Sequence, residues 1–161
     1  MYKMKDIKYG YLYNGENIYP YDNWDNNFYK KYLLQINNEL EKTKYGVCWD
    51  FVELERYYLK QTNLNFKSYF IFSNDGMEFP NHTFIIVNLN DKFIWIEKSW
   101  EKYQGLHEYD SLNEALEDIK NKFIKYTGKN EKISIYEYEE PKKLNANEFY
   151  EHCENGHKIM I

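Results

Sequence analysis

Residues 82–100 read HTFIIVNLNDKFIWIEKSW and carry the clearest structural signal in the chain. Two segments rich in β-branched and aromatic residues, HTFIIVNL (82–89) and KFIWIEKSW (92–100), flank the dipeptide Asn90-Asp91. Segments of this composition are typical of β-strands, and a two-residue connection of this kind is typical of a β-hairpin. The stretch therefore predicts two adjacent antiparallel strands.

The two-residue turn also fixes the register of the predicted hairpin. Leu89 pairs with Lys92, so paired positions sum to 181, and His82 lies opposite Ser99. Because side chains alternate between the faces of a strand, His82 and Glu97 share one face and are diagonal neighbours. A turn longer by one residue would put Glu97 on the opposite face. The sequence thus predicts a carboxylate within reach of an imidazole.

The segments around this hairpin predict a mixture of helices and strands. We expect a short strand or hairpin before Tyr21, helices at 24–42, from Cys48 and from Ser111 to Gly128, strands at 69–73 and 133–139, a loop at 74–80, and a helical tail at 144–153. The expected fold class is α+β, with N-terminal helices packed on a mostly antiparallel sheet.

Length and composition predict a single domain over residues 1–161. The net charge is -5, and lysines are scattered among acids, so we expect no nucleic-acid binding. No segment has the length and composition of a signal peptide or a membrane span. We therefore expect a cytoplasmic protein, with no membrane association and with both of its 2 cysteines reduced. The oligomeric state is left open.

Cys48 is a candidate nucleophile because it falls where a loop is predicted to become a helix. A thiol at a helix N-terminus feels the positive end of the helix dipole, which favours the thiolate. Gly46, two residues earlier, allows a sharp bend and a close approach to a substrate. Cys48 lies at the edge of the predicted apolar stripe formed by Val47, Phe51, Leu54 and Tyr58. The alternative interpretation is an inert buried cysteine.

A nucleophilic cysteine needs a base, and the base needs an orienting acceptor. His82 at the start of a strand is the candidate base, and Glu97 is the candidate acceptor. Taken alone, a histidine at a strand start is more often a surface residue, and a strand glutamate is usually solvated. The order Cys48, His82, Glu97, with the register above, favours a catalytic triad.

The segments GVCWDFVELERYYL, NHTFIIVNLNDKFIWIEKSW and GLHEYDSLNEAL resemble the transglutaminase-like superfamily of papain-like thiol enzymes. The resemblance covers about residues 28–125 as the core and leaves a C-terminal strand and tail at 129–161. It implies a papain/transglutaminase-like core in which Cys48, His82 and Glu97 form the triad. The third position departs from the family, which usually has Asp there.

The resemblance also implies an oxyanion site and a substrate groove. The backbone N–H of Cys48 is expected to bind the oxyanion, and Gln35 and Trp24 are the candidate side-chain helpers. The candidate residues for the substrate groove are Trp49, Gly46 and Asn81.

The tail holds His152, Cys153 and His157, whose spacing fits no closed zinc pattern. We interpret the tail as structural and expect no metal and no cofactor.

The expected function is thiol-dependent acyl transfer on peptide or glutamine amide bonds. Hydrolysis, as a peptidase, amidase or deamidase, is the first expectation, and transfer to an amine, as in a transglutaminase, is the second. The expected partner is a protein or peptide substrate. The alternative is a non-catalytic protein-binding module that retains the fold.

Overall fold

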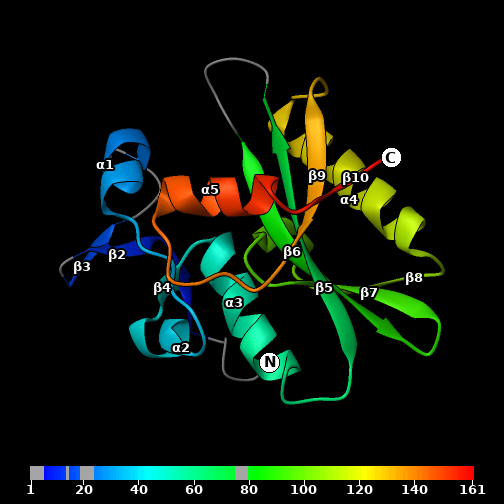
Figure 1. Ribbon diagram of the computed structural model, residues 1–161, viewed down its shortest axis with the longest axis horizontal. Helices are drawn as coiled ribbons and strands as arrows, with labels where there is room; N and C mark the ends of the chain where they lie inside the picture. Colours follow the sequence, from blue (N-terminus) through cyan, green and yellow to red (C-terminus); the bar gives the residue numbers. More distant parts are fainter. Residues whose placement is uncertain (1–5, 14, 19–23, 75–79) are drawn as a thin grey trace.

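A computed structural model describes residues 6–13, 15–18, 24–74 and 80–161. Its elements run in the order β1 (Lys8–Tyr9), β2 (Tyr11–Tyr13), β3 (Glu16–Ile18), α1 (Trp24–Lys31), α2 (Glu39–Thr43), β4 (Tyr45–Gly46), α3 (Cys48–Leu59), β5 (Asn65–Ser73), β6 (Asn81–Leu89), β7 (Lys92–Glu97), the 3-10 helix η2 (Glu101–Tyr103), β8 (Gly105–Tyr109), α4 (Leu112–Thr127), β9 (Ile133–Tyr138), α5 (Ala146–Glu154) and β10 (His157–Ile159). The α+β class is confirmed (Figure 1).

Six strands form one antiparallel sheet in the order β10-β9-β5-β6-β7-β8. Two separate pairs of short strands accompany this sheet. Strands β2 and β3 form an antiparallel pair, and β1 runs parallel to β4. The parallel pair joins the beginning of the chain to the residues that directly precede α3.

The predicted hairpin register is confirmed over the whole β6–β7 ladder. Its pairs run from Leu89↔Lys92 to Ile85↔Ile96. Asn90 and Asp91 have φ values of 51° and 61°, so both adopt the left-handed conformation of a type I′ turn. Beyond Ile85 the two strands separate, and the last predicted pair, His82 with Ser99, does not form part of the ladder.

Alternating side chains of the sheet build two separate cores. On β5, Tyr69 and Ile71 pack on the face covered by α4. Phe70 and Phe72 point to the other face, where α3 and α5 lie. Figure 1 shows α4 on one side of β9 and β5, with α3 and α5 on the other side. The sheet is therefore the middle of three layers.

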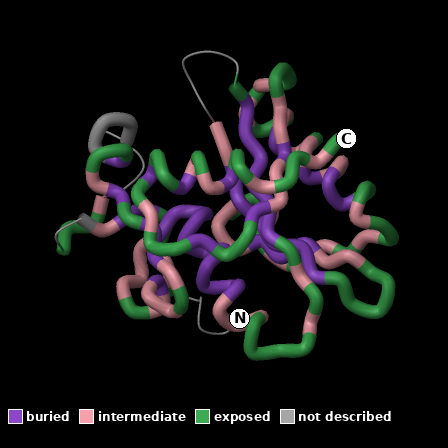
Figure 2. Tube along the Cα trace, in the orientation of Figure 1, coloured by how far each residue is buried: buried purple, intermediate pink, exposed green. Residues whose placement is uncertain are grey.

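Helix α3 lies in the centre of the molecule and is enclosed on all sides over residues 48–56 (Figure 2). Cys48 and Val52 belong to the core between α3 and the sheet, whereas Phe51 and Leu54 pack with Leu40 of α2. The prediction that Cys48 lies at the edge of a single apolar stripe is therefore wrong. Because both faces of the helix pack on other elements, the cysteine is buried.

The predicted helix at 24–42 is also wrong, because the chain breaks it into α1 and α2. Leu33 forms a β-bridge with Asn145, and the N–H of Leu34 donates to the carbonyl of Leu144 over 2.8 Å. Asn37 then takes a left-handed φ of 53°. These contacts with a segment more than a hundred residues away replace the helical hydrogen bonds.

The other expected elements are present. Ser111 caps α4, accepting from the N–H of Glu114, and Gly128 ends this helix with a φ of 71°. Helix α5 confirms the helical tail, and β9 confirms the late strand. Strands β8 and β10 were not predicted. Residues 14, 19–21 and 75–79, in the predicted opening hairpin and loop, lie outside the described residues. None of the described helices is long and apolar enough to cross a membrane.

Candidate active site

His82 and Glu97 form a buried ion pair at the point where β6 and β7 separate. The His82 Nε2 and Glu97 Oε2 atoms are 2.7 Å apart, and only 10% and 2% of the two side chains are exposed. The other carboxylate oxygen, Oε1, accepts from the backbone N–H groups of Ser99 at 2.9 Å and Trp100 at 2.8 Å. Glu97 is thus held from behind while it orients the imidazole.

The negative charge of Glu97 raises the pKa of His82 to about 10. Burial alone would lower the pKa, because it penalises the charged ring. The Glu97 carboxylate outweighs that effect, and hydrogen bonding and charge from Cys48 add to the rise. The Trp100 ring meets the imidazole edge-on at 5.1 Å. His82 is therefore an imidazolium near neutral pH.

Cys48 reaches this pair from the first residue of α3. It is a free cysteine, 4% exposed, and Val47 is the N-cap of its helix. By strand alternation His82 belongs to the α4 face of the sheet, since it pairs with Ile71. The side chain of His82 nevertheless forms a hydrogen bond with the side chain of Cys48. The structure thus brings the predicted triad together.

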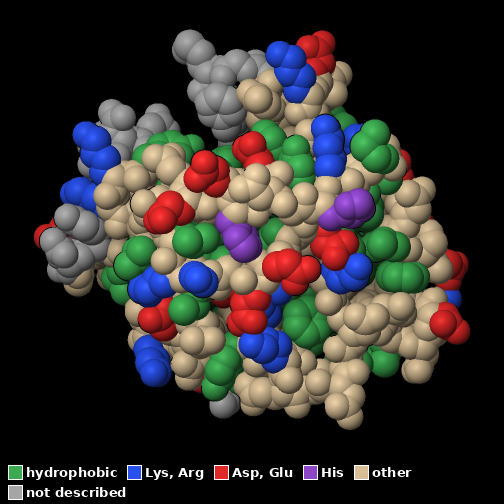
Figure 3. Space-filling model, in the orientation of Figure 1, with side chains coloured by type: hydrophobic (Ala, Val, Ile, Leu, Met, Phe, Trp, Pro, Cys, Tyr) green, Lys and Arg blue, Asp and Glu red, His purple; other side chains and the backbone are tan. Residues whose placement is uncertain are grey.

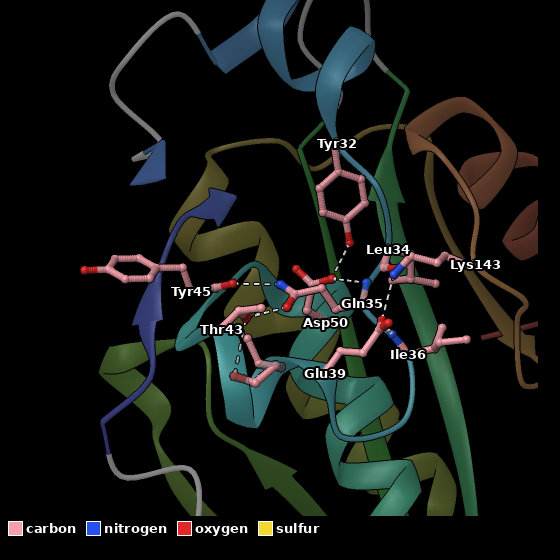
Figure 4. Close-up of polar contacts among 10 residues, drawn as sticks. Tyr32, Leu34, Gln35, Ile36, Glu39, Thr43, Tyr45, Asp50 and Lys143 are labelled. Carbon is pink, nitrogen blue, oxygen red and sulfur yellow. Dashed lines mark hydrogen bonds and ion pairs between the residues drawn. The ribbon is translucent and has the colours of Figure 1, made fainter. Parts of the chain in front are cut away.

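Asp50 fixes the loop that presents Cys48 (Figure 4). Its carboxylate accepts from the N–H of Val47 at 2.8 Å, from the N–H of Gln35 at 2.9 Å and from the hydroxyl of Tyr32 at 2.7 Å. Burial raises the pKa of Asp50 to about 7, although the three donors act in the opposite direction. One buried side chain therefore joins the start of α3 to the segment that follows α1.

Gln35, one of the two predicted oxyanion helpers, has its side chain engaged within the loop before Cys48. The Gln35 amide donates to the carbonyl of Tyr45 over 2.7 Å and accepts from the hydroxyl of Thr43 (Figure 4). The prediction for Gln35 is wrong because these contacts use its amide to support the loop before Cys48. Trp24 begins α1, and its side chain lies outside the described residues.

Tyr9 is a site residue that the sequence analysis missed. In the parallel β1–β4 pair Tyr9 lies beside Gly46, and the N–H of Gly10 donates to the Gly46 carbonyl over 3.0 Å. Burial of its hydroxyl raises the pKa of Tyr9 well above the usual value, and the charge and side chain of Cys48 add to the rise. The residue as a whole is still 39% exposed, so only its hydroxyl end is buried beside Cys48. No periodic pattern in the tyrosine-rich opening segment predicts this pairing.

Gly46 has a packing role and not the predicted role in a substrate groove. It is buried in β4, and a Cβ atom at this position would lie 2.5 Å from Leu40 Cδ1 and 3.0 Å from Asp50 Cβ. The absence of a side chain at Gly46 therefore leaves space for Leu40 of α2 and for Asp50, which fixes the loop before Cys48.

We expect Gly46→Ala to lower the free energy of unfolding by about 1–3 kcal/mol, the usual cost of overpacking a core. The substitution is measured by urea denaturation. The double variant with Leu40→Ala, which removes the clashing methyl group, should cost less than the sum of the two single changes. Strict additivity would contradict this explanation of Gly46.

The other two groove candidates, Trp49 and Asn81, are structural as well. Trp49 is 2% exposed and stacks on Phe149 with ring centroids 4.4 Å apart. Its indole N–H donates to Asn81 Oδ1 over 2.9 Å, and Asn81 Nδ2 donates to the Tyr150 hydroxyl over 2.5 Å. The groove prediction is wrong for Trp49, which is buried in the core. Asn81 is half-buried and joins α3 to β6 and α5.

The histidines and cysteine of the tail are dispersed. Cys153 is buried in the core, and burial raises the pKa of its thiol well above the usual value. His152 Nε2 donates to the carbonyl of Glu139 over 2.7 Å, and His157 lies on β10. Among the described residues no group of three or more His, Cys, Asp or Glu side chains is arranged to hold a metal ion.

The chain matches no protein-family model, and no curated protein matches it significantly. On the face seen in Figure 3, lysine and arginine side chains are interspersed with acids and do not form a basic patch. The function of the protein is therefore inferred from the group formed by Cys48, His82, Glu97 and Tyr9.

Proposed function

We propose that the protein is an enzyme of thiol-dependent acyl transfer that acts on peptide or glutamine amide bonds. One observation carries the proposal. The His82 imidazole, held by Glu97 at 2.7 Å, also forms a hydrogen bond with the side chain of Cys48. A thiol, an imidazole and an orienting carboxylate in this order form the constellation of thiol acyltransferases.

The reaction has two stages. The Cys48 sulfur attacks the amide carbonyl carbon, the C–N bond breaks, and His82 gives its proton to the leaving nitrogen. The product is a thioester on Cys48. Water then attacks this thioester, with His82 as the base, and releases a carboxylic acid and the regenerated cysteine. An amine that attacks in place of water would give a new amide, and hydrolysis is our first choice.

Two hydrogen-bonding groups lie where negative charge would develop on the substrate oxygen. Cys48 is the first residue of α3, so its N–H has no acceptor within the helix. The Tyr9 hydroxyl is near both this N–H and the sulfur. Because its pKa is raised, Tyr9 stays protonated and can donate a hydrogen bond. We assign these two groups to the oxyanion site.

The burial of Cys48 supports the second candidate, a protein-binding module without turnover. At 4% exposure the sulfur is not open to a large substrate unless β1 and Tyr9 move aside. A reduced thiol also fits the cytoplasmic location that we propose, since both cysteines are free.

Incubation with a library of glutamine-containing peptides distinguishes the two candidates. We expect ammonia release or peptide cleavage by the native protein, at least about 1,000-fold above the rate of Cys48→Ala. Cys153→Ser is the matched control, because it removes the other thiol and should keep the activity. The binding-module candidate is favoured instead if there is no product and both cysteines react slowly and equally with a thiol probe.

A further inference from the structure

A second buried acid, Glu55, faces the His82–Glu97 pair from α3. Glu55 follows Cys48 by seven residues, which places both side chains on the same side of the helix, about 10 Å apart along its axis. The residue is 5% exposed. Glu97 and His82 are the charged groups that affect it most. Glu55 is therefore close enough to the ion pair for the charges of Glu97 and His82 to act on it.

The two acids have opposite surroundings. Glu97 accepts hydrogen bonds from His82, Ser99 and Trp100. The Oε2 atom of Glu55 is buried and has no hydrogen-bond partner among the described residues. Arg56, the cation next to Glu55 in the chain, is instead engaged by Glu53 at 2.9 Å and by Ser68 at 2.6 Å.

A buried carboxylate oxygen that lacks a donor disfavours the charged form of the group, which takes up a proton instead. Burial raises the pKa of Glu55 well above its usual value, and the charge of Glu97 raises it further. His82 and Lys98 act in the opposite direction, and Glu53 on the same helix adds a weaker upward effect. Environments that differ in this way separate two acids into a charged and a neutral one.

We propose that Glu55 is a positioning residue of the candidate site that is kept as a neutral acid, so that Glu97 alone presents a negative charge to His82. This inference rests on the proposed function and deepens it. One carboxylate stabilises the imidazolium beside the thiol. A second negative charge at Glu55 would hold the proton on His82 more tightly and would slow its transfer to the leaving nitrogen.

The test follows the titration of the His82 ring by NMR in the full-length protein. Gln has the shape of a neutral Glu, so we expect Glu55→Gln to leave the His82 midpoint within about 0.3 pH unit of the native value. Glu97→Gln, the matched control, should lower it by more than about one unit. A fall of one unit or more in Glu55→Gln would overturn the proposal, because it would show that a negative charge had been removed.

An infrared difference spectrum between the native protein and Glu55→Gln gives a second measurement. We expect the native protein to show the carbonyl band of a protonated carboxyl group that the variant lacks. A carboxylate band in its place contradicts the proposal. Should Glu55→Gln fail to fold, Glu55→Met, which is also uncharged, has the same expected titration.

Neither measurement depends on turnover. A neutral Glu55 in a protein without acyl-transfer activity would sink the proposed function and leave the charge assignment standing. A charged Glu55 in an active enzyme would overturn the charge assignment and leave the proposed function standing.

Discussion

Replacing His82 by alanine is expected to slow the alkylation of Cys48 about 30-fold at pH 7. A thiol with the ordinary cysteine pKa is only about 3% ionised at this pH, and the thiolate is the reactive form. The pKa of His82 is about 10, so its ring is charged at this pH. A positive charge beside a cysteine favours the reactive form of the thiol. Stopped-flow alkylation with iodoacetamide, in a Cys153→Ser background, measures Cys48 alone.

The pH profile of the same reaction tests the charge of the pair. Alkylation of the His82-containing protein should be faster than that of His82→Ala at every pH at which the His82 ring is charged. His152→Ala is the matched control, because this ring contacts the carbonyl of Glu139 and lies outside the site. Equal rates and equal profiles with and without His82 would remove the thiolate–imidazolium pair from the mechanism.

Glu97→Gln is expected to lower the free energy of unfolding by about 3 kcal/mol at pH 6, the usual cost of breaking a buried ion pair. The pKa of His82 is about 10 in the folded protein and about 6.5 when unfolded. A raised pKa contributes stability that is complete below about pH 6.5, and the contribution is lost as the pH rises toward 10. The difference between the two proteins should therefore shrink as the pH rises.

Urea denaturation at a series of pH values measures this difference. Asp50 and Glu53, whose pKa values are both raised to about 7 by burial, titrate in the same range. They are present in both proteins, so their effects cancel when the curves are subtracted. Glu101→Gln is the control, since this neighbouring glutamate is exposed. If the Glu97 and Glu101 variants lost the same small amount of stability at every pH, the ion pair would have no role in folding.

The hairpin and its consequence for the site were predictable from the sequence because they depend on local information. The two-residue turn at Asn90-Asp91 sets the register, and the register places Glu97 on the face of His82. The contact between His82 and Glu97 forms even though the strands separate before the predicted pair of His82 and Ser99. Local capping signals likewise predicted the ends of α4 correctly at Ser111 and Gly128.

The features that were not predicted depend on contacts between distant parts of the chain. Tyr9 reaches Cys48 only because β1 pairs in parallel with β4, and no local pattern encodes this pairing. The helix expected at 24–42 is broken because Leu33 and Leu34 bond to residues near 145. Gly46, Trp49 and Asn81 were assigned to a groove, whereas the tertiary packing puts all three in the interior or at its margin.

The position of β5 between β6 and β9 affects how the chain is made. The central strand of the sheet obtains one of its two neighbours from residues 133–138, more than sixty residues later in synthesis. A nascent chain that has released β5 and β6 but not β9 therefore exposes a long apolar strand edge, which is prone to aggregation. Folding of the sheet core must wait until most of the polypeptide has left the ribosome, and chaperones are expected to engage this chain while it is still being translated.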